Sequence, residues 1–426
     1  MELRLQKRYR HLVESHLNVV QAVAAGIKAI PGVEKSFAAT QAAWRFFRNP
    51  DVTLGELIGP LQDVGREACM VSGSPYALIA FDWSKMDYDG HANKPDLTQL
   101  SHAQDLGYEM ATALLIDAAD GSPLAPMGLS VLCSLGMYST ESKSVQPPVA
   151  HLDQVLSWME HSNSWSLGRR PVFVIDREAD SVKHLRAWDA AGHLFLVRAD
   201  DRRLSFRGSS QLLSEVALTL EHEGCFKSYG KVSIRGQMGT QSIAETEVIL
   251  DQPANGTTAD GKSCRIPGIP LNVRLVVVHV RDDDGKLLAE WWLLTNVLDV
   301  SALQIATWYY WRWRIETFHK LLKSSGLEME EWLQESALAI TKRLLVGCMA
   351  CVTVWALQRQ TTPEAETCKA FLVRLSGRQM KRKRPVTAPA LMSGLHLLLT
   401  MLQVLESHTV EQLQAYAKIA APVLRL

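Results

Sequence analysis

Five polar side chains in one stretch of this chain have the types and spacing needed to bind a metal ion and phosphate groups. The stretch, SALQIATWYYWRWRIETFHKLLKSSG, spans residues 301–326. At about 100° per residue of an α-helix, the five side chains fall within a sector of about 80°. They comprise one carboxylate, three cations and a tyrosine: Tyr309, Arg312, Glu316, Lys320 and Lys323.

This polar face has two interpretations. In the first, it is a solvated ladder of i,i+4 ion pairs from Arg312 through Glu316 to Lys320, which contributes about a few tenths of a kcal/mol per pair. In the second, Glu316 binds a metal ion while its cationic neighbours contact phosphate oxygens. The spacing alone favours neither, so the rest of the chain must decide between them.

The same stretch predicts one amphipathic helix over 301–326. Ser301 and Gln304 have the form of a capping box at its start, and Ser324–Gly326 supply a stop signal. The opposite side carries large apolar residues, which must pack on a core and so turn the polar face outward or into a cleft. These apolar residues are Trp308, Trp311, Ile315, Phe318 and Leu322.

Two aspartates upstream complete apolar, strand-like runs. YALIAFD ends at Asp82 and PVFVID ends at Asp176. Ligands of open α/β sheets gather at the ends of strands, so we expect both aspartates at a site. Asp82 is preferred over Asp87 and Asp89, because those two fall in the polar turn MDYDGHANK.

Asp176 competes with two other acids of the sequence DREAD. We prefer Asp176 because it directly ends the strand, whereas Glu178 and Asp180 are better placed to cap the following helix or to pair with Arg177 and Lys183. Two strand-end aspartates and a helical glutamate repel one another unless cations neutralise them. Hard oxygen ligands of this kind select magnesium or manganese.

The order of elements indicates an α/β fold. Three strands, a helix, a strand, a helix and a strand between about residues 71 and 204 are typical of an RNase H-like mixed sheet core. Runs such as ETEVILD and EWWLLTN predict a β-strand insertion at about 205–296 before the site helix. We therefore expect an N-terminal helical region at 1–70, a catalytic domain at 71–330 and a C-terminal helical region at 331–426.

The 426-residue chain balances 45 basic residues against 45 acidic ones, so it has no overall attraction for nucleic acid. Binding to nucleic acid must use local basic patches. Three stretches supply such patches, although a charge run is more often a solvated surface. They are residues 4–10, 198–207 and 378–384.

Seven scattered cysteines, an odd number, indicate a reducing compartment and no disulfide framework. Cys348 and Cys351 form a CxxC inside the apolar run 344–357 with no second pair nearby, so we predict core residues. That run of 14 residues is too short to span a bilayer, and the start MELRLQKRYRHL lacks a signal-peptide apolar region. The sequence predicts a cytoplasmic protein with no membrane contact.

Four stretches together resemble the bacterial cut-and-paste DDE transposases of the insertion-sequence-four type, in the RNase H-like transposase superfamily. The stretches are WYYWRWRIETFHKLLKSSG, FVIDREADSV, LFLVR and WWLLTN. Tyr309, Arg312, Glu316 and Lys323 match the YREK signature of that family at its spacing Y-x2-R-x3-E-x6-K. Lys320 matches a further lysine of the same helix.

The resemblance implies that Asp82, Asp176 and Glu316 are the catalytic triad and the metal ligands. It implies two Mg²⁺ ions per active site, with Mn²⁺ able to substitute. Asp82 would bridge both ions, and the other two carboxylates would each complete one coordination shell. Two such ions activate a water or a 3′-hydroxyl and stabilise the leaving oxygen, so no protein general base is required.

The resemblance also implies a set of DNA-binding residues. Arg198 lies where the family has an arginine that contacts the transposon end. Trp291, with Trp292 beside it, lies where the family has a tryptophan that stacks on an extruded base. The remaining DNA-binding residues are on the site helix: Tyr309, Arg312, Lys320 and Lys323.

The implied function is that of a DNA transposase, which cleaves double-stranded DNA at transposon ends through hairpins and joins the ends to target DNA. Members of the family act as dimers on paired ends, which implies a homodimer in the bacterial cytoplasm that associates with the nucleoid when acting. Two alternatives stay open. One is a metal-dependent DNA nuclease without strand transfer, and the other is a catalytically silent DNA-binding regulatory relative.

Overall fold

Strand β1 (Tyr76–Asp87) is an interior strand of a large mixed sheet. It pairs antiparallel with β3 (Leu106–Asp117) on one side and parallel with β6 (Arg170–Ile175) on the other. The first half of β1, Tyr76–Phe81, is buried on both faces, as its continuous apolar sequence predicts. The strand does not end at Asp82 as expected, because β3 pairs with it as far as Asp87.

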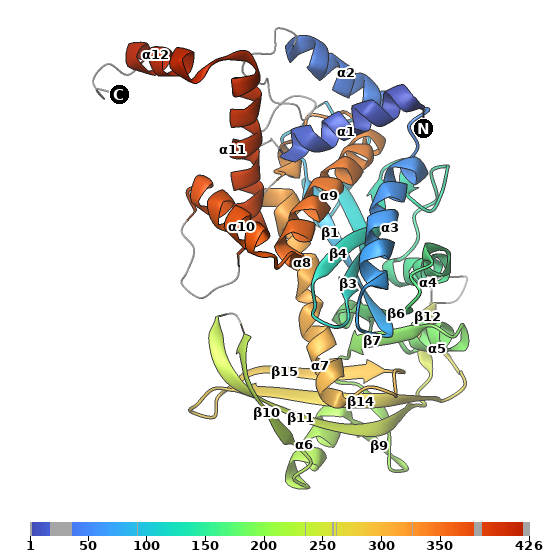
Figure 1. Cartoon of the computed structure of the whole chain (residues 1–426). Coiled ribbons are helices and arrows are strands. Elements are labelled where there is room, and N and C mark those ends of the chain that lie inside the picture. Colours follow the sequence, from blue (N-terminus) through green and yellow to red (C-terminus); the bar gives the residue numbers. More distant parts are fainter. Residues whose placement is uncertain are drawn as a thin grey trace.

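The computed structural model describes residues 2–17, 36–91, 93–234, 236–257, 260, 262–325, 327–378 and 386–420. Within them a 13-stranded sheet runs in the order β5-β4-β3-β1-β6-β7-β15-β14-β11-β8-β9, with β10 paired to β11 and β2 to β3. The protein is therefore a mixed α/β protein built on one large mixed sheet (Figure 1).

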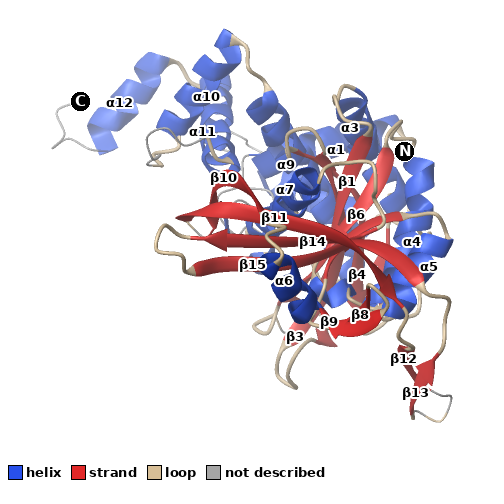
Figure 2. Ribbon diagram, turned by 90° about the horizontal axis from the view of Figure 1, so that it is seen from below, coloured by secondary structure: helices blue, strands red, loops and turns tan. Residues whose placement is uncertain are grey.

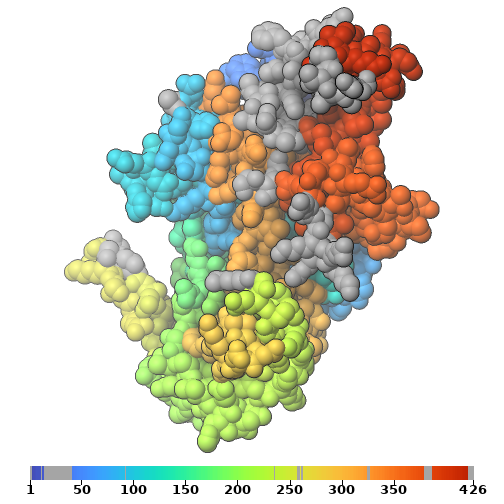
Figure 3. Space-filling view, turned by 90° about the vertical axis from the view of Figure 1, so that its left-hand side faces the viewer, coloured from blue at the N-terminus to red at the C-terminus, as the bar shows by residue number. Residues whose placement is uncertain are grey.

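The remaining strands have the following bounds: β2 (Thr98–Gln99), β4 (Pro123–Cys133), β5 (Gly136–Ser139), β7 (Leu194–Arg198), β8 (Arg203–Phe206), β9 (Ser209–Leu212), β10 (Lys227–Ile234), β11 (Gln237–Leu250), β14 (Leu271–Arg281) and β15 (Leu287–Thr295). A separate hairpin of β12 (Ala254–Thr257) and β13 (Ser263–Ile266) projects from the body (Figures 2 and 3).

The α-helices have the following bounds: α1 (Leu3–Leu17), α2 (Ser36–Arg48), α3 (Leu54–Met70), α4 (His151–Ser162), α5 (Val182–Ala190), α6 (Leu213–His222), α7 (Ala302–Trp311), α8 (Trp313–Lys320), α9 (Ala337–Arg359), α10 (Pro363–Leu375), α11 (Ala388–Ser407) and α12 (Val410–Ala420). Short helical turns lie at η2 (Asn163–Trp165), η3 (Arg177–Ala179), η4 (Leu321–Ser325) and η5 (Met329–Glu331).

The N-terminal and C-terminal helices pack on each other as well as on the sheet. Helix α9 contacts α1, α2 and α3, and both α3 and α9 lie against β4 (Figure 1). The start of α3 is fixed by the predicted capping box, in which Glu56 N–H donates to Thr53 Oγ1 at 3.2 Å and Thr53 N–H donates to Glu56 Oε2 at 3.2 Å. Residues 18–35 of the expected N-terminal region lie outside the described residues.

The predicted β insertion joins the main sheet instead of forming a layer of its own. Strand β15 pairs antiparallel with β7, with Leu293 opposite Arg198. The end of the WWLLTN motif fixes this pairing, because Thr295 Oγ1 donates to the Phe195 carbonyl at 2.6 Å and the Asn296 side-chain oxygen accepts from Phe195 N–H at 3.0 Å. Strong twist then carries β11 and β14 across the direction of β1 (Figures 1 and 2).

The single helix predicted over 301–326 is divided into α7, α8 and a π-helical turn, η4. The break is at Arg312, whose N–H bonds the Tyr309 carbonyl three residues back at 3.1 Å. The helix tightens where contacts with the rest of the protein hold the side chains of Trp311 and Arg312 in place. Trp311 packs on Gly121, which has φ +74° and no room for a Cβ atom, and the Arg312 side chain is buried. Tertiary contacts override the uniform helical pattern here.

Among the residues that the structure describes, two helices are long and apolar enough to cross a membrane by length and composition alone. The apolar run 344–357 lies within α9, a 23-residue helix whose apolar window is 83% buried inside the protein. Cys348 and Cys351 are buried in it, as expected for core residues. In α11 only 33% of the window is buried, and apolar side chains are exposed near its end.

Candidate active site

Strand register places Asp82 beside Asp176. The last pair of the parallel β1–β6 ladder is Ala80 with Val174, so two residues further along each strand lead to Asp82 and Asp176. Neighbouring strands are about 4.8 Å apart, and residues level with each other in a parallel pair point to the same face. Asp176 follows the end of β6 as predicted. Asp82 lies within β1, at the point where β6 no longer pairs with it.

The third carboxylate comes from α8 and reaches the aspartates through Arg312. The Arg312 guanidinium donates to Glu316 Oε1 at 2.6 Å and its Nη1 lies 3.6 Å from Asp82 Oδ2. The Arg312 side chain is only 6% exposed. Its Nε and Nη1 atoms are buried without a hydrogen-bond partner in the described part of the chain. The predicted ion pair between Arg312 and Glu316 exists, but its Arg312 end is buried, whereas the Glu316 side chain is 37% exposed.

The three carboxylates lie close enough for their charges to act on one another. Burial raises the pKa of Asp82 to about 7, and the negative charges of Asp176 and Glu316 push in the same direction, while Arg312 opposes them. Although burial lowers the pKa of Arg312, the nearby Tyr309 and the three acids raise it overall. One arginine therefore compensates three converging carboxylates incompletely, and a further cation would stabilise the group.

The structure separates Asp176 from its acidic neighbours. Asp176 caps η3, and its Oδ1 accepts from Glu178 N–H at 2.9 Å. The Glu178 side chain turns away to bond His151, and Asp180 is buried in an ion pair with Arg202 at 3.1 Å. Both neighbours are thus engaged in protein contacts, in agreement with the preference for Asp176.

A second acidic group lies on the turn after β1. Asp87, Asp89 and Asp105 have carboxylate oxygens within 4.8 Å of one another. These carboxylates hold the turn, because Asp89 Oδ1 accepts from Leu106 N–H at 2.6 Å and Asp105 Oδ2 accepts from Ser101 N–H at 2.9 Å. Asp87 and Asp89 are exposed, which supports the choice of Asp82.

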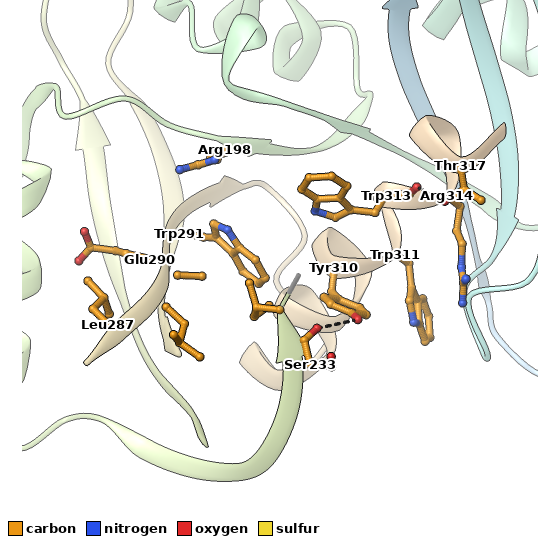
Figure 4. A pocket seen from close by; sticks show the side chains of 13 residues that line it. Arg198, Ser233, Leu287, Glu290, Trp291, Tyr310, Trp311, Trp313, Arg314 and Thr317 are labelled. Atoms are coloured by element: carbon orange, nitrogen blue, oxygen red, sulfur yellow. Dashed lines mark hydrogen bonds between the residues drawn. The ribbon is translucent and has the colours of Figure 1, made fainter. Parts of the chain in front are cut away.

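Beside the carboxylates lies a cavity of about 710 Å³ lined by aromatic residues and arginines (Figure 4). Arg198, at the end of β7, and Trp291 of β15 form one side, and Tyr310 and Trp313 come from the site helix. Of the two neighbouring tryptophans, Trp291 lines this cavity. The alternation of side chains along a strand points Trp292 to the other face of the sheet.

Tyr309 is buried behind this cavity. Its side chain is 3% exposed, and its ring packs edge-on against Trp291 with ring centroids 5.6 Å apart. The Arg312 guanidinium lies 5.9 Å from the same ring. Tyr309 therefore supports two candidate site residues, whereas the sequence pattern placed it on an open polar face.

The two lysines of the site helix differ in their surroundings. Lys320 is exposed. Lys323 bonds the backbone carbonyl of Lys85 in β1, and its Nζ atom lies 3.3 Å from Glu330. Lys323 thus ties η4 to the strand that carries Asp82.

Sequence reasoning missed Tyr310 and Trp313, which line the cavity and are 38% and 44% exposed. A signal for them exists in the run WYYWRW, because this run holds more aromatic residues than one apolar stripe of a helix can bury. The surplus aromatics must face something other than the core. His151 was also missed, since only the fold brings it to the site.

No known protein-family profile matches this chain. The assignment of a function therefore depends on the site itself. Its three acidic side chains supply hard oxygen ligands and carry more negative charge than Arg312 compensates. The nearby cavity has arginine and aromatic walls, to which Trp313 and Thr317 of the site helix contribute. This donor set fits a divalent cation such as Mg²⁺ or Mn²⁺.

Proposed function

We propose that this protein is a DDE-type DNA transposase, which cleaves DNA at the ends of a mobile element with divalent metal ions and joins those ends to target DNA. One observation carries the proposal. Asp82, Asp176 and Glu316, from three separate elements, interact around a buried arginine.

The sheet topology supports an RNase H-like core. In the order β4-β3-β1-β6-β7, the first three strands are antiparallel neighbours and the last two run parallel to β1. The order of elements in the sequence led to the same expectation. The two aspartates then come from the central strand and its parallel neighbour, where ligands of α/β sheets collect.

Asp82, Asp176 and Glu316 would hold two Mg²⁺ ions, or two Mn²⁺ ions. When bound, such ions activate a water or a 3′-hydroxyl and stabilise the leaving oxygen of the phosphodiester. Arg312 holds Glu316 and Asp82 in place before metal arrives, so that the carboxylates do not separate by repulsion. Because Glu316 and Lys320 share one helix, the same element positions both a metal ligand and a phosphate-binding cation.

The cavity beside the carboxylates fits a DNA base drawn out of the helical stack. Cleavage through a hairpin bends DNA sharply, and extruding a base costs about a few kcal/mol, which stacking on an aromatic ring offsets. Trp291 and Trp313 supply such rings, and Arg198 supplies a cation for the adjoining phosphate. Tyr309 acts in this scheme through its contacts to Trp291 and Arg312.

The ends of the chain support DNA binding and pairing. Arg4, Lys7, Arg8 and Arg45 of α1 and α2 line a groove of about 630 Å³, which suits a DNA backbone. On α11 the exposed Met401, Leu402 and Leu405 are available for a second copy, in line with a homodimer on paired ends. All seven cysteines are free, in line with a cytoplasmic location.

The test uses linear DNA that carries the sequences flanking the gene, a target plasmid and Mg²⁺ or Mn²⁺. We expect metal-dependent cleavage, hairpin-ended fragments on a denaturing gel, and products joined to the plasmid. Asp176→Ala should give none of these products but should still retard the DNA on a native gel. Wild-type protein that binds DNA without cleaving it in either metal would refute an active transposase. Cleavage without hairpins or joined products would instead identify a nuclease.

A further inference from the structure

His151, the first residue of α4, lies between two glutamates and against a tryptophan. Its Nε2 lies 2.6 Å from Glu109 Oε1 of β3, and its Nδ1 bonds Glu178 of η3. Its ring is stacked on Trp83 of β1, with centroids 4.5 Å apart and an angle of 12° between the planes. We call these four residues the His151 clamp. It connects four elements that are separate in the chain.

Two members of the clamp fix the two candidate aspartates. Asp82 Oδ1 accepts from the backbone N–H of Trp83 at 2.9 Å. Asp176 Oδ1 accepts from the backbone N–H of Glu178 at 2.9 Å. The residues whose N–H groups orient the aspartate carboxylates are therefore the same residues that His151 holds through their side chains.

The charge of His151 suits this position. The hydrogen bond with Glu109, reinforced by Glu178, raises the pKa of His151 to about 9, although burial opposes the rise. Both ring nitrogens then carry protons, and each donates to one glutamate. The positive charge of the imidazolium is thus paired with the two glutamates of the clamp.

We propose that His151 is a positioning residue that sets the affinity of the Asp82, Asp176 and Glu316 site for divalent metal ions. It does so by holding Trp83 and Glu178, and hence the carboxylates they orient, in one arrangement. This inference rests on the proposed function, because it assumes that the three acids are metal ligands. Partners that orient metal ligands without touching the metal commonly change its affinity by about 10- to 100-fold.

His184 provides a matched control. It also bonds two side chains, Ser181 at 2.8 Å and Asp153 at 2.9 Å, and it lies on the neighbouring helix α5. Its bonds connect α5 to α4 and reach neither Trp83 nor Glu178. Loss of its ring nitrogens should perturb the packing of these helices without loosening the aspartates.

The experiment measures Mn²⁺ binding by isothermal titration calorimetry at pH 7.5 on the full-length protein, without DNA. His151→Phe keeps a ring to stack on Trp83 but removes both donors, and we expect Mn²⁺ to bind about tenfold more weakly. His151→Gln restores one donor and should recover part of the affinity. His184→Phe should bind Mn²⁺ like the wild type. Urea unfolding of each variant verifies that it is folded.

Two further variants separate this inference from the proposed function. Glu178→Ala frees His151 from η3 at an exposed position, where a folding defect is not expected, and it should also weaken Mn²⁺ binding. Asp176→Ala should abolish tight binding. If Asp176→Ala loses Mn²⁺ while His151→Phe and Glu178→Ala bind within twofold of the wild type, the role of His151 is overturned alone. If Asp176→Ala binds Mn²⁺ like the wild type, the proposed metal site itself is wrong.

Discussion

Strand β1 carries one member of each of two acidic groups, and the two groups differ in what satisfies them. In the turn after β1, Asp87, Asp89 and Asp105 are close together, but backbone N–H groups of the turn occupy their oxygens. At the candidate site, Asp82 is largely buried, and its carboxylate accepts the Trp83 N–H while also facing Arg312 and two other acids. Proximity of carboxylates alone therefore does not mark a metal site.

The two groups also shift the pKa of their members in opposite directions. Burial raises the pKa of Asp82, whereas hydrogen bonds from Ser101 lower the pKa of Asp105. The turn uses its negative charge for local structure, so nothing there is left to be neutralised. At the candidate site, burial and the neighbouring acids disfavour the charged form of Asp82. Five predictions test this difference.

Glu316→Gln should reduce metal-dependent DNA cleavage by at least about a hundredfold, because an amide keeps the shape of the side chain but is a poor ligand for Mg²⁺. Asp87→Asn, the matched change in the turn, should cleave within about twofold of the wild type. Initial rates on end-bearing DNA in Mg²⁺ compare the two. Equal losses in both variants would remove the distinction between the groups.

Arg312→Met should lower the free energy of unfolding by about 3 kcal/mol at pH 8 in a chelating buffer, because it leaves buried carboxylates without a partner. Saturating Mn²⁺ should restore a large part of the lost free energy of unfolding, since a divalent cation can replace the arginine charge. Urea unfolding with and without Mn²⁺ provides the measurement. A variant that Mn²⁺ does not stabilise would show that the acids are not metal ligands.

Asp82→Asn should gain stability relative to the wild type as pH rises. The folded-state pKa, raised from 3.8 to about 7, means that folded protein holds a proton that the unfolded chain releases between these values. That stability is present at low pH and is lost as pH rises to about 7. In chelating buffer, the free energy of unfolding of the variant should rise relative to that of the wild type by about 2 kcal/mol between pH 4 and pH 8.

Asp105→Asn should show the opposite pH dependence: relative to the wild type, it should lose stability as the pH rises. Its lowered pKa contributes stability that is present at neutral pH and is lost as the solution becomes more acidic than the ordinary value of 3.8. Urea unfolding of both variants across the pH range gives two slopes to compare. If stability relative to the wild type changed with pH in the same direction for both variants, burial would not distinguish the two groups.

Lys323→Ala should have the smallest effect, about 1 kcal/mol of stability, because Lys323 bonds the Lys85 carbonyl between the two acidic groups. Lys320→Ala should leave stability unchanged, since this side chain is exposed. If both lysines also contact phosphate, each variant should reduce the salt dependence of DNA binding by about one unit of slope. Binding titrations at several salt concentrations would detect an unchanged slope.

The sequence predicted the local features that short-range chemistry decides. The end of β6 at Asp176, the capping box at Thr53 and the buried side of the site helix follow from patterns a few residues long. The two candidate aspartates were chosen because each ends an apolar run, and Glu316 because it lies on the polar face of its helix. The alignment of parallel strands brings the two aspartates together, but it says nothing about Glu316.

Long-range pairing produced the features that were not predicted. Strand β1 passes Asp82 because β3 continues beside it, and β15 joins β7 through Thr295 and Asn296. Tyr309 is buried because Trp291 arrives from another strand. Helical periodicity describes one element in isolation, so it cannot report what that element meets.

The division of the site among distant segments has a consequence for synthesis of the chain. Strands β1, β3 and β4 can pair as soon as they leave the ribosome, but β7 has an open edge until β15 appears, and Glu316 follows only after that. Contacts between such distant segments form late in folding. A chain released before α8 would carry both aspartates on an incomplete sheet and no glutamate, so the three acids can come together only after synthesis has passed α8.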